Sequence, residues 1–410
     1  MEEQPAQSFH SESAAAWLPN RRALLLLAAA IFFVSLGFGF FESTFNNFAV
    51  NELNLTPRAL GVLEAMRETP GFLNAFVSAA TLHLAEPVVA GICLALMGLG
   101  FISLSRVRTT VGLIFWSVAW SLGFHTWGPV SSTIALGATT PGQEGKTLGW
   151  LNSVGSLAGL AGVGGVFLLS EHLHLRIFFV IGGLAVLVAA ACASRVPPLQ
   201  VTEARPRLVF RRRYWLYYLL CFLDGWRRQM WYTFALFLLV REYHTSLRIV
   251  ASLVFMGRLG SILAAPQIGK AIDRLGPRTV MSTGYVIIAA VFAGYCFVRV
   301  PLILRACYAF DYVLSNLGVG LTTYANQLAP QQDLRATLAM GTTANHVAAV
   351  IGPVLGGLVW QRFGYQTAFL SGLVTVLVFV ALSLLLPRTS GRLPLGFPPA
   401  QMAGEQTGTE

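Results

Sequence analysis

Charged side chains are scarce in this sequence. Only 11% of its 410 residues are Asp, Glu, Lys or Arg, whereas 55% are hydrophobic. Soluble domains carry about 25% charged residues, so this composition excludes an ordinary soluble protein. The hydrophobic residues form runs of about 20, the helix length that crosses the hydrocarbon layer of a membrane. Because backbone groups in lipid must bond within their own segment, we expect these runs to be helices.

Motifs of catalysis, metal binding and nucleotide binding are also missing. The sequence has no H-E-x-x-H, no G-x-S-x-G and no phosphate-cradling P-loop, which argues against a membrane enzyme and against ATP as a driving force. The five cysteines are scattered through apolar runs without CxxC or Cys/His spacing. We expect them to be buried packing residues, and we expect no enzyme activity, cofactor or metal site.

Apolar runs fall into two sets of six. They lie at 22–49, 58–81, 87–104, 109–136, 147–170 and 175–194, and then at 213–240, 246–269, 279–298, 301–328, 336–361 and 365–386. The stretch from Arg195 to Arg213, with six arginines and three prolines, separates the sets. We therefore predict an all-α membrane protein with an N-terminal tail (1–20), a six-helix bundle (21–195), a linker (196–212), a second six-helix bundle (213–387) and a C-terminal tail (388–410).

The net charge of +10 is explained by where the basic residues lie. They gather in the linker and at the ends of the runs, not on a soluble face, so no nucleic-acid partner is expected. Segments on the linker side hold more arginine and lysine than segments on the other side. The positive-inside rule then predicts a multi-pass protein of the cell (inner) membrane with a cytoplasmic linker and cytoplasmic termini. Its surroundings are the lipid bilayer, and a monomer is expected.

The two halves look like a repeat. Glu144 and Lys146 precede the Gly-rich fifth run, and Asp333 and Arg335 precede the Gly-rich eleventh run at the same offset. Parallel halves related by an axis along the membrane normal are a known plan of transporters.

One short segment carries a family resemblance. Residues 269–278 read GKAIDRLGPR and resemble the G-x-x-x-D-R-x-G-x-R loop signature of the major facilitator superfamily, with Gly269, Asp273, Arg274, Gly276 and Arg278 at the signature positions. The segment IGPVLGG at 351–357, which contains Pro353, is similar to the Gly-Pro signature of the same family.

The resemblance implies twelve transmembrane helices in two pseudo-symmetric six-helix bundles and transport by alternating access. It also implies that the loop is a conformational gate, in which the acid caps a neighbouring helix and the basic groups bond across the bundle. The sequence departs from the family at 80–87, ATLHLAEP, where the first-half copy of the signature lacks its Asp-Arg-x-Gly core. Any gate there must be weaker or differently built.

Charges within the seventh run are candidates for substrate binding. A charge at the bilayer centre costs at least about 2.5–3.5 kcal/mol, so it needs a partner or a water-filled cavity. Asp224, Arg227 and Arg228 share one helical face. They form either a self-paired brace or a site for an anionic or zwitterionic group. Trp226, like the nearby Trp231, either stacks on an aromatic substrate or packs in the core.

Acids in the first two runs are candidates for proton coupling. Arg67 can fully satisfy only one of Glu64 and Glu68, which leaves a carboxylate to carry a proton, although Glu64 alternatively faces the outer vestibule. Glu42 has no charged residue within a helical turn and shares its face with Asn46, a candidate substrate contact. Glu42 is therefore the first choice for a proton site.

For other polar residues in the runs, the sequence does not determine the interaction partners. Asp311, near Tyr308 and Tyr312, is a further candidate substrate contact, and Arg258 can pair with Asp311 or with Glu42. His125 and His346 either line the cavity or pack as ordinary buried histidines, and no metal-ligand spacing joins them.

The sequence thus predicts a secondary active transporter of a small organic solute, driven by protons because the runs offer carboxylates. The alternative is a protein of the same fold that no longer transports. Such a protein would sense a ligand or assist the assembly of a membrane complex, and the degraded first-half signature is the feature that favours it.

We predict that a cysteine placed at Ala204 is cytoplasmic. In a chain whose native cysteines have been replaced, Ala204→Cys should react with an impermeant thiol reagent only after the membrane is opened. Modification from outside intact cells would contradict the predicted topology.

Overall fold

The computed structural model describes residues 20–81, 83–140, 142–198 and 210–387. The predicted tails at 1–20 (apart from residue 20) and 388–410, and most of the linker at 196–212, lie outside these ranges. Within them every regular element is a helix and no strand is found, so the predicted all-α class is confirmed.

Six α-helices precede the linker: α1 (Arg21–Asn47), α2 (Pro57–Ala80), α3 (Glu86–Leu104), α4 (Thr110–Gly137), α5 (Glu144–Leu169) and α6 (Leu175–Ala193). A π-helical segment, η1 (Phe48–Glu52), continues α1. The second half contains η2 (Arg212–Tyr214), α7 (Trp215–Arg241), α8 (Leu247–Phe297), α9 (Pro301–Leu314), η3 (Ser315–Gly318), α10 (Val319–Leu328), α11 (Gln331–Phe363) and α12 (Tyr365–Ser383).

Local sequence sets where several helices begin. α2, α4 and α8 start after Thr56, Thr109 and Ser246, whose side chains accept hydrogen bonds from free backbone N–H groups of the first turn. Pro87 and Pro301 stand in the first turns of α3 and α9, where a missing N–H costs nothing.

Each of the twelve predicted runs coincides with a helical segment, and α9, η3 and α10 together form one of them. In the described part of the chain, eight helical segments are long and apolar enough to cross a membrane. The helices outside that set are α2, α4 and α7, and α2 and α7 carry the charged clusters. Twelve crossings therefore stay a prediction, whereas the helical architecture is observed.

The signature segment joins the predicted eighth and ninth runs without an extended loop. Both runs fall within α8, which consists of two helices that meet at a sharp bend. Its helical geometry is interrupted at Gly276, whose φ of 78° and ψ of 157° are closed to residues with a side chain. The glycine of the signature is thus needed for the turn itself.

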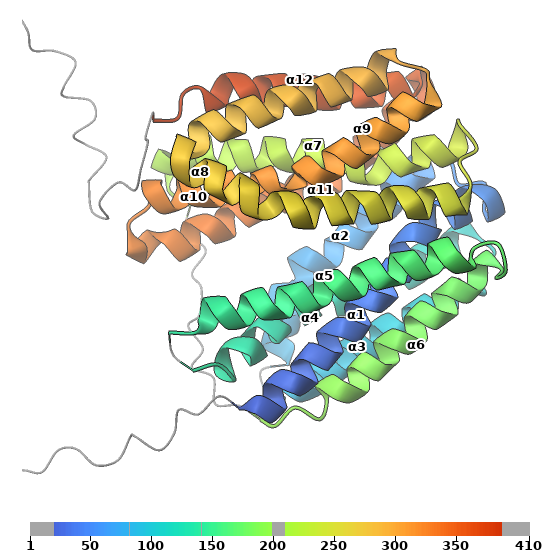
Figure 1. Cartoon of the computed structure of the whole chain (residues 1–410), viewed down its shortest axis with the longest axis vertical. Coiled ribbons are helices and arrows are strands. Elements are labelled where there is room, and N and C mark those ends of the chain that lie inside the picture. The colour runs from blue at the N-terminus through green and yellow to red at the C-terminus, as the bar shows by residue number, and fades with distance from the viewer. Residues whose placement is uncertain (1–19, 82, 141, 199–209, 388–410) are drawn as a thin grey trace, which may run out of the picture.

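The helices form two side-by-side groups in Figure 1, α1–α6 and α7–α12. α1 packs on α5 and α6, while α7 packs on α11 and α12; the main contacts between the groups are α2 with α11 and α5 with α8. α1 and α7 begin, and α6 and α12 end, at one end of the molecule (Figure 1). We call this the linker end and the opposite one the far end.

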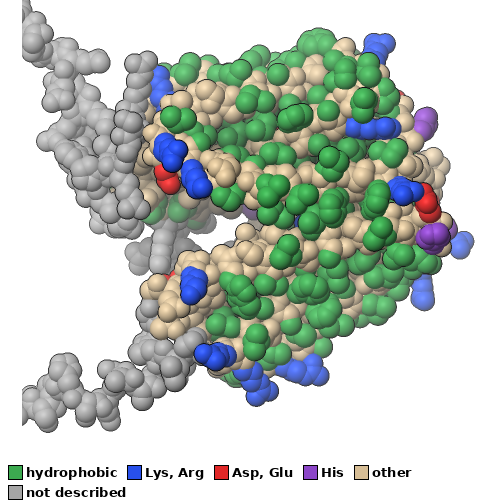
Figure 2. Space-filling view, viewed as in Figure 1, with side chains coloured by type: hydrophobic (Ala, Val, Ile, Leu, Met, Phe, Trp, Pro, Cys, Tyr) green, Lys and Arg blue, Asp and Glu red, His purple; other side chains and the backbone are tan. Residues whose placement is uncertain are grey.

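The surface fits a membrane. Hydrophobic side chains cover the flank seen in Figure 2, and the Lys and Arg side chains gather toward the two ends. Large exposed residues such as Leu25, Val111 and Leu168 point outward from their helices, as expected for side chains in contact with lipid.

We predict that Gly276→Ala destabilises the protein by about 1–3 kcal/mol, because alanine must adopt a conformation reserved for glycine. Gly269→Ala is the matched control. Gly269 belongs to the same signature, has helical geometry and has nothing near the added methyl group, so its replacement should be neutral or slightly stabilising. Thermal melting in detergent measures both; equal melting temperatures would contradict the assignment of the kink to Gly276.

Candidate functional site

The two halves are bonded together at the far end. A buried side-chain amide, a guanidinium and an exposed ion pair cross the interface there: Asn47 Nδ2 to Thr245 O at 3.0 Å, Arg241 Nη1 to Leu55 O at 2.7 Å, and Arg248 to Glu171. Each pair joins the first half to the second.

α2 and α11 touch backbone to backbone near the same end. A Cβ atom added to Gly61 would lie 2.1 Å from the carbonyl oxygen of Pro353, and one added to Gly357 would lie 2.4 Å from that of Pro57. Small residues allow such close crossings in membranes. Pro353, predicted to act in a gate, therefore lies at a contact between the halves.

At the linker end the halves are separated. A cavity of about 410 Å³ lies between α1, α4, α5 and α8, and Figure 2 shows a notch between the halves at this end. We call this cavity the vestibule. Its polar lining consists of Ser35, Ser131, Ser132, Asn152, Ser156 and Arg258. The molecule is thus open at the linker end and closed at the far end.

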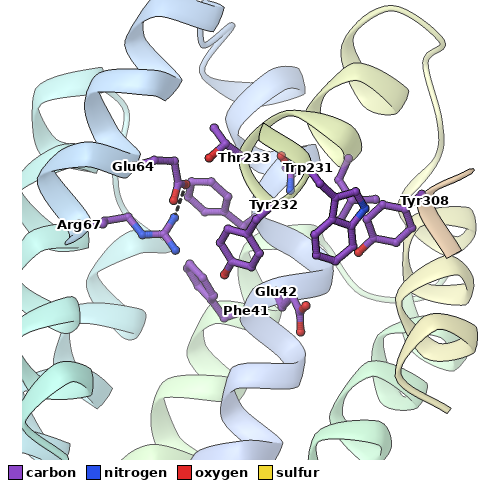
Figure 3. Close-up of a pocket in the computed structure, with 11 residues that line it drawn as sticks. Phe41, Glu42, Glu64, Arg67, Trp231, Tyr232, Thr233 and Tyr308 are labelled. Carbon is purple, nitrogen blue, oxygen red and sulfur yellow. Dashed lines mark hydrogen bonds and ion pairs between the residues drawn. The ribbon is translucent and has the colours of Figure 1, made fainter. Parts of the chain in front are cut away.

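A second, much smaller pocket lies deeper, between α1, α2, α7 and α9 (Figure 3). We call it the central pocket. Its volume is about 30 Å³, room for about two water molecules. Its walls include Phe41, Glu42, Phe45, Asn46, Glu64, Arg67, Trp231, Tyr232, Thr233 and Tyr308. Both halves contribute, so the pocket must change shape when the halves move.

Polar atoms around the central pocket are left without partners. Glu64 Oε2 and Thr233 Oγ1 are buried and make no hydrogen bond within the described part of the chain. Buried polar atoms in folded proteins almost always have partners. These two atoms are therefore suited to bind water or a solute.

Glu42 and Arg258 form an ion pair between the halves. Arg258 Nε donates to Glu42 Oε2 at 3.0 Å, Nη2 donates to the same oxygen, and Tyr312 Oη donates to Oε1 at 3.2 Å. No charged residue lies within a helical turn of Glu42 on α1, and its partner comes instead from α8. The choice left open for Arg258 is decided for Glu42 rather than Asp311.

The ion pair separates the two cavities, since Glu42 lines the central pocket and Arg258 lines the vestibule. Gly159 of α5 makes room for the arginine: a Cβ atom there would lie 2.5 Å from Arg258 Nη1. The backbone of Arg258 therefore belongs to the second half, whereas its guanidinium lies among residues of the first half.

The cluster on α7 contains both a brace and an accessible arginine. Arg227, 1% exposed, bonds to Asp224 at 3.0 Å and to Asp311 at 2.7 Å, and Tyr285 also donates to Asp224. Arg228 bonds to Asp224 at 2.7 Å, yet 42% of its side chain is exposed. Of the two arginines predicted to contact substrate, only Arg228 is accessible.

Of the three charged residues predicted on α2, two pair with each other and the third approaches the second half. Arg67 Nη1 pairs with Glu64 at 2.6 Å, and its guanidinium lies 4.8 Å from the centre of the Trp120 ring. Glu64 is 4% exposed, so it faces no open vestibule in this conformation, which is closed at the far end. Glu68 instead approaches His346 of α11, with 3.3 Å between Oε2 and Nδ1.

His346 also lies beside His125, with 5.9 Å between the ring centres. Gly71 of α2 lies against both rings. The two histidines therefore belong to the interface between the halves and do not simply pack within one bundle.

Trp226 lies away from the pockets. Its Nε1 approaches Ser371 Oγ of α12 at 3.5 Å, and it does not line the central pocket, so it fits the packing alternative. Trp231 does line the pocket and stacks on Tyr308, with ring centres 5.4 Å apart. Asn46 lines the pocket as well.

The signature side chains make few bonds in this conformation. Asp273 and Arg274 are exposed, and no hydrogen bond from either is found in the residues that the structure describes. Arg278 Nη1 donates to Leu386 O at 3.0 Å, just past the end of α12. The helix-capping bond expected of Asp273 is thus not formed here.

Sequence reasoning missed the partners of Asp333. This acid at the start of α11 pairs with Arg211 at 2.9 Å and with Arg213, and it accepts a hydrogen bond from Tyr214 at 3.0 Å. Desolvation alone would raise the pKa of Asp333, but the bonds from Tyr214 and Arg213 and the charge of Arg211 hold that pKa below its ordinary value. The acid at the same place in both halves, Glu144 and Asp333, was the only signal in the sequence. It marked the position of Asp333 but did not identify the residues that bind it.

Comparisons with known proteins agree with this architecture. Residues 214–402 match the family model described as Major Facilitator Superfamily. The nucleoside transporter NupG has a similar structure, with a TM-score of 0.73 and 13% identity over 88% of this chain and 98% of that chain. A search of curated proteins by sequence finds no match.

A bacterial homologue of the human lysosomal transporter Spinster is also similar. Its inward-facing, unoccupied structure gives a TM-score of 0.70 and 12% identity over 92% of this chain and 98% of that chain. Its inward-facing, occupied structure gives 0.72 and 13% over 92% and 99%. At these identities the likeness shows the fold. Together with the match over the second half, it confirms the resemblance to the major facilitator superfamily.

We predict that Arg227→Gln destabilises the protein by about 3–5 kcal/mol, because it leaves two buried acids without their shared cation. Arg228→Gln, one residue along the same helix, should cost less than about 1 kcal/mol because 42% of its side chain is exposed to solvent. Denaturation in detergent measures both variants. Similar losses would contradict the division of the cluster into a brace and an accessible arginine.

Proposed function

We propose that this chain, similar to the major facilitator superfamily in its fold and in its signature segments, is a secondary active transporter of a small organic solute. The observation that carries the proposal is the asymmetry of the interface. The halves are bonded at the far end and separated by the vestibule at the linker end. Alternating access requires such a state and its opposite.

In this proposal the bundles at 21–195 and 213–387 rock against each other in the cell (inner) membrane. The linker and both termini are cytoplasmic, so the vestibule opens to the cytoplasm. One chain lines both the vestibule and the central pocket, which fits a monomer.

Protons are proposed as the driving ion because two acids reach across the interface. Glu42 pairs with Arg258 of α8, and Glu68 Oε2 lies 3.3 Å from Nδ1 of His346 of α11. Protonation of Glu42 removes one member of an ion pair between the halves, so proton binding changes the free energy of their separation. Glu64 has its partner on its own helix and is the weaker candidate.

An anionic or zwitterionic solute is proposed because the most accessible member of the charged cluster on α7 is cationic. Tyr232 lines the central pocket, and Arg228 precedes it by one turn on the same face of α7. The neighbouring Asp224 is 2% exposed, whereas Arg228 is 42% exposed. Asn46 and Thr233 supply further hydrogen-bonding groups, while the buried Asp311 acts through Arg227.

Alternating access is tested by disturbing the contact between α2 and α11. Gly61→Ala places a methyl group against the Pro353 carbonyl, so the far end should close less well and the population should shift toward the opposite state. Two single-cysteine reporters in a chain without native cysteines follow the two states. Asn152→Cys lies in the lining of the vestibule, and Thr245→Cys lies at a buried position of the far end.

Without further change, the thiol of Asn152→Cys should react fast and that of Thr245→Cys slowly. Adding Gly61→Ala should slow the first reaction and speed the second, and it should slow solute flux in proteoliposomes. Gly149→Ala is the matched control, since Gly149 has open space around it. A protein of this fold that only senses a ligand or assembles a complex would show no flux, and unchanged labelling in Gly61→Ala would contradict alternating access.

A further inference from the structure

We propose that Arg258 is an anion-binding residue of the vestibule, and that Glu42 occupies it until Glu42 takes up a proton. The inference rests on the proposed transport function and narrows the solute to a small organic anion carrying a carboxylate, sulfonate or phosphate group. Proton uptake by Glu42 would expose the binding group, so the solute and the proton would be bound together.

The vestibule has the size and lining of a solute site. Its volume of about 410 Å³ lies within the range of about 300–1,000 Å³ typical of ligand pockets. Serine hydroxyls and Asn152 form most of its polar surface, and Arg258 is the one charged side chain among the described residues that line it. Neutral groups can orient a solute here, and one guanidinium supplies the charge.

Arg258 presents a free edge to this space. Its Nε and Nη2 both bind the same oxygen of Glu42, while Nη1 lies beside Gly159. No hydrogen bond from Nη1 is found among the residues that the structure describes. A guanidinium can hold a carboxylate or a phosphate through two parallel bonds, so an entering anion can use the geometry that Glu42 now uses.

Glu42 can release Arg258 and still keep a hydrogen bond of its own. Its other oxygen is held by Tyr312 Oη, and this hydroxyl can remain bonded to a protonated carboxyl group. Tyr308 and Tyr232 are the other titratable groups that face it from α9 and α7. Glu64 and Arg67 face it across the central pocket, but they are already paired with each other.

The exchange explains how solute and proton would be coupled. A protonated Glu42 would leave Arg258, a partly buried cation, without its anionic partner, which is costly. An anion relieves that cost, so each ligand raises the affinity for the other by the same factor. The proton comes from water in the vestibule, and the guanidinium stays charged throughout.

The test uses benzenesulfonate and methanesulfonate, which stay anionic at every pH used, with neutral benzenesulfonamide as the comparison ligand. Binding to the purified full-length protein should strengthen as the pH is lowered, because protonation of Glu42 frees the guanidinium. Glu42→Gln should bind the sulfonates about tenfold or more tightly at the higher pH, the range of one charge-assisted bond, and should lose the pH dependence. The sulfonamide should respond to neither change.

Arg258→Gln should lose sulfonate binding, and Arg258→Lys, which keeps the charge without the fork, should weaken it. Glu171→Gln is the matched control, because Glu171 also pairs with an arginine of α8, Arg248, but at the exposed far end. Its sulfonate affinity and pH dependence should equal those of the parent.

Equal sulfonate affinity in the parent and in Glu42→Gln, or retained binding in Arg258→Gln, would overturn the inference. If Glu42→Gln fails to fold, pH-independent binding by the parent would overturn it as well. Labelling of the reporters Asn152→Cys and Thr245→Cys keeps the two proposals apart. If labelling shows alternating access but no sulfonate binds, only the anion site is contradicted. If the protein shows neither alternating access nor solute flux, the transport proposal is contradicted.

Discussion

A charged side chain within a membrane must find a partner, and this requirement organises the interior of the molecule. Some pairs lie within one half: Glu64 with Arg67, and Arg227 with Asp224 and Asp311. These pairs move with their bundle and are suited to hold it rigid. Other pairs join the halves, and they must break or exchange whenever the halves separate. The same electrostatic cost therefore stabilises the bundles and makes the interface between them switchable.

Close backbone packing is the second requirement at the interface. Gly61 and Gly357 allow α2 and α11 to meet through main-chain atoms, with Pro353 at the crossing. A crossing without intervening side chains is sensitive to a single added methyl group. It also needs no large rearrangement of rotamers when it opens, which suits a contact that forms and breaks in each cycle.

The sequence predicted what depends on local spacing. Runs of about 20 apolar residues marked the helices, and the separations of three and four residues placed Asp224, Arg227 and Arg228 on one face. It did not predict which arginine is buried, because that depends on where Asp311 of α9 lies. For Arg258 the sequence left two partners open, Asp311 and Glu42, because Arg258 and Glu42 lie 216 positions apart in the chain.

The signature segment shows the limit of a resemblance as well. Its glycine is explained by the positive φ at Gly276, a property of the kink that any conformation sharing that turn must keep. Asp273 and Arg274, by contrast, are exposed in this conformation. The structure therefore explains the glycine of the signature by local geometry, whereas the roles expected of Asp273 and Arg274 stay predictions.

The chemistry of the bonds between the halves changes with depth. At the far end, Asn47 and Arg241 donate to backbone carbonyl groups, which do not titrate. Nearer the centre, Glu42 and Glu68 meet Arg258 and His346, so at least one partner in each pair can change its charge. In the proposed mechanism, protons would alter the ion pair between the vestibule and the central pocket without loosening the bonds at the far end. A solute bound beside that pair would be close enough for its charge to act on Glu42 directly, and coupling would then need no long pathway through the bundle.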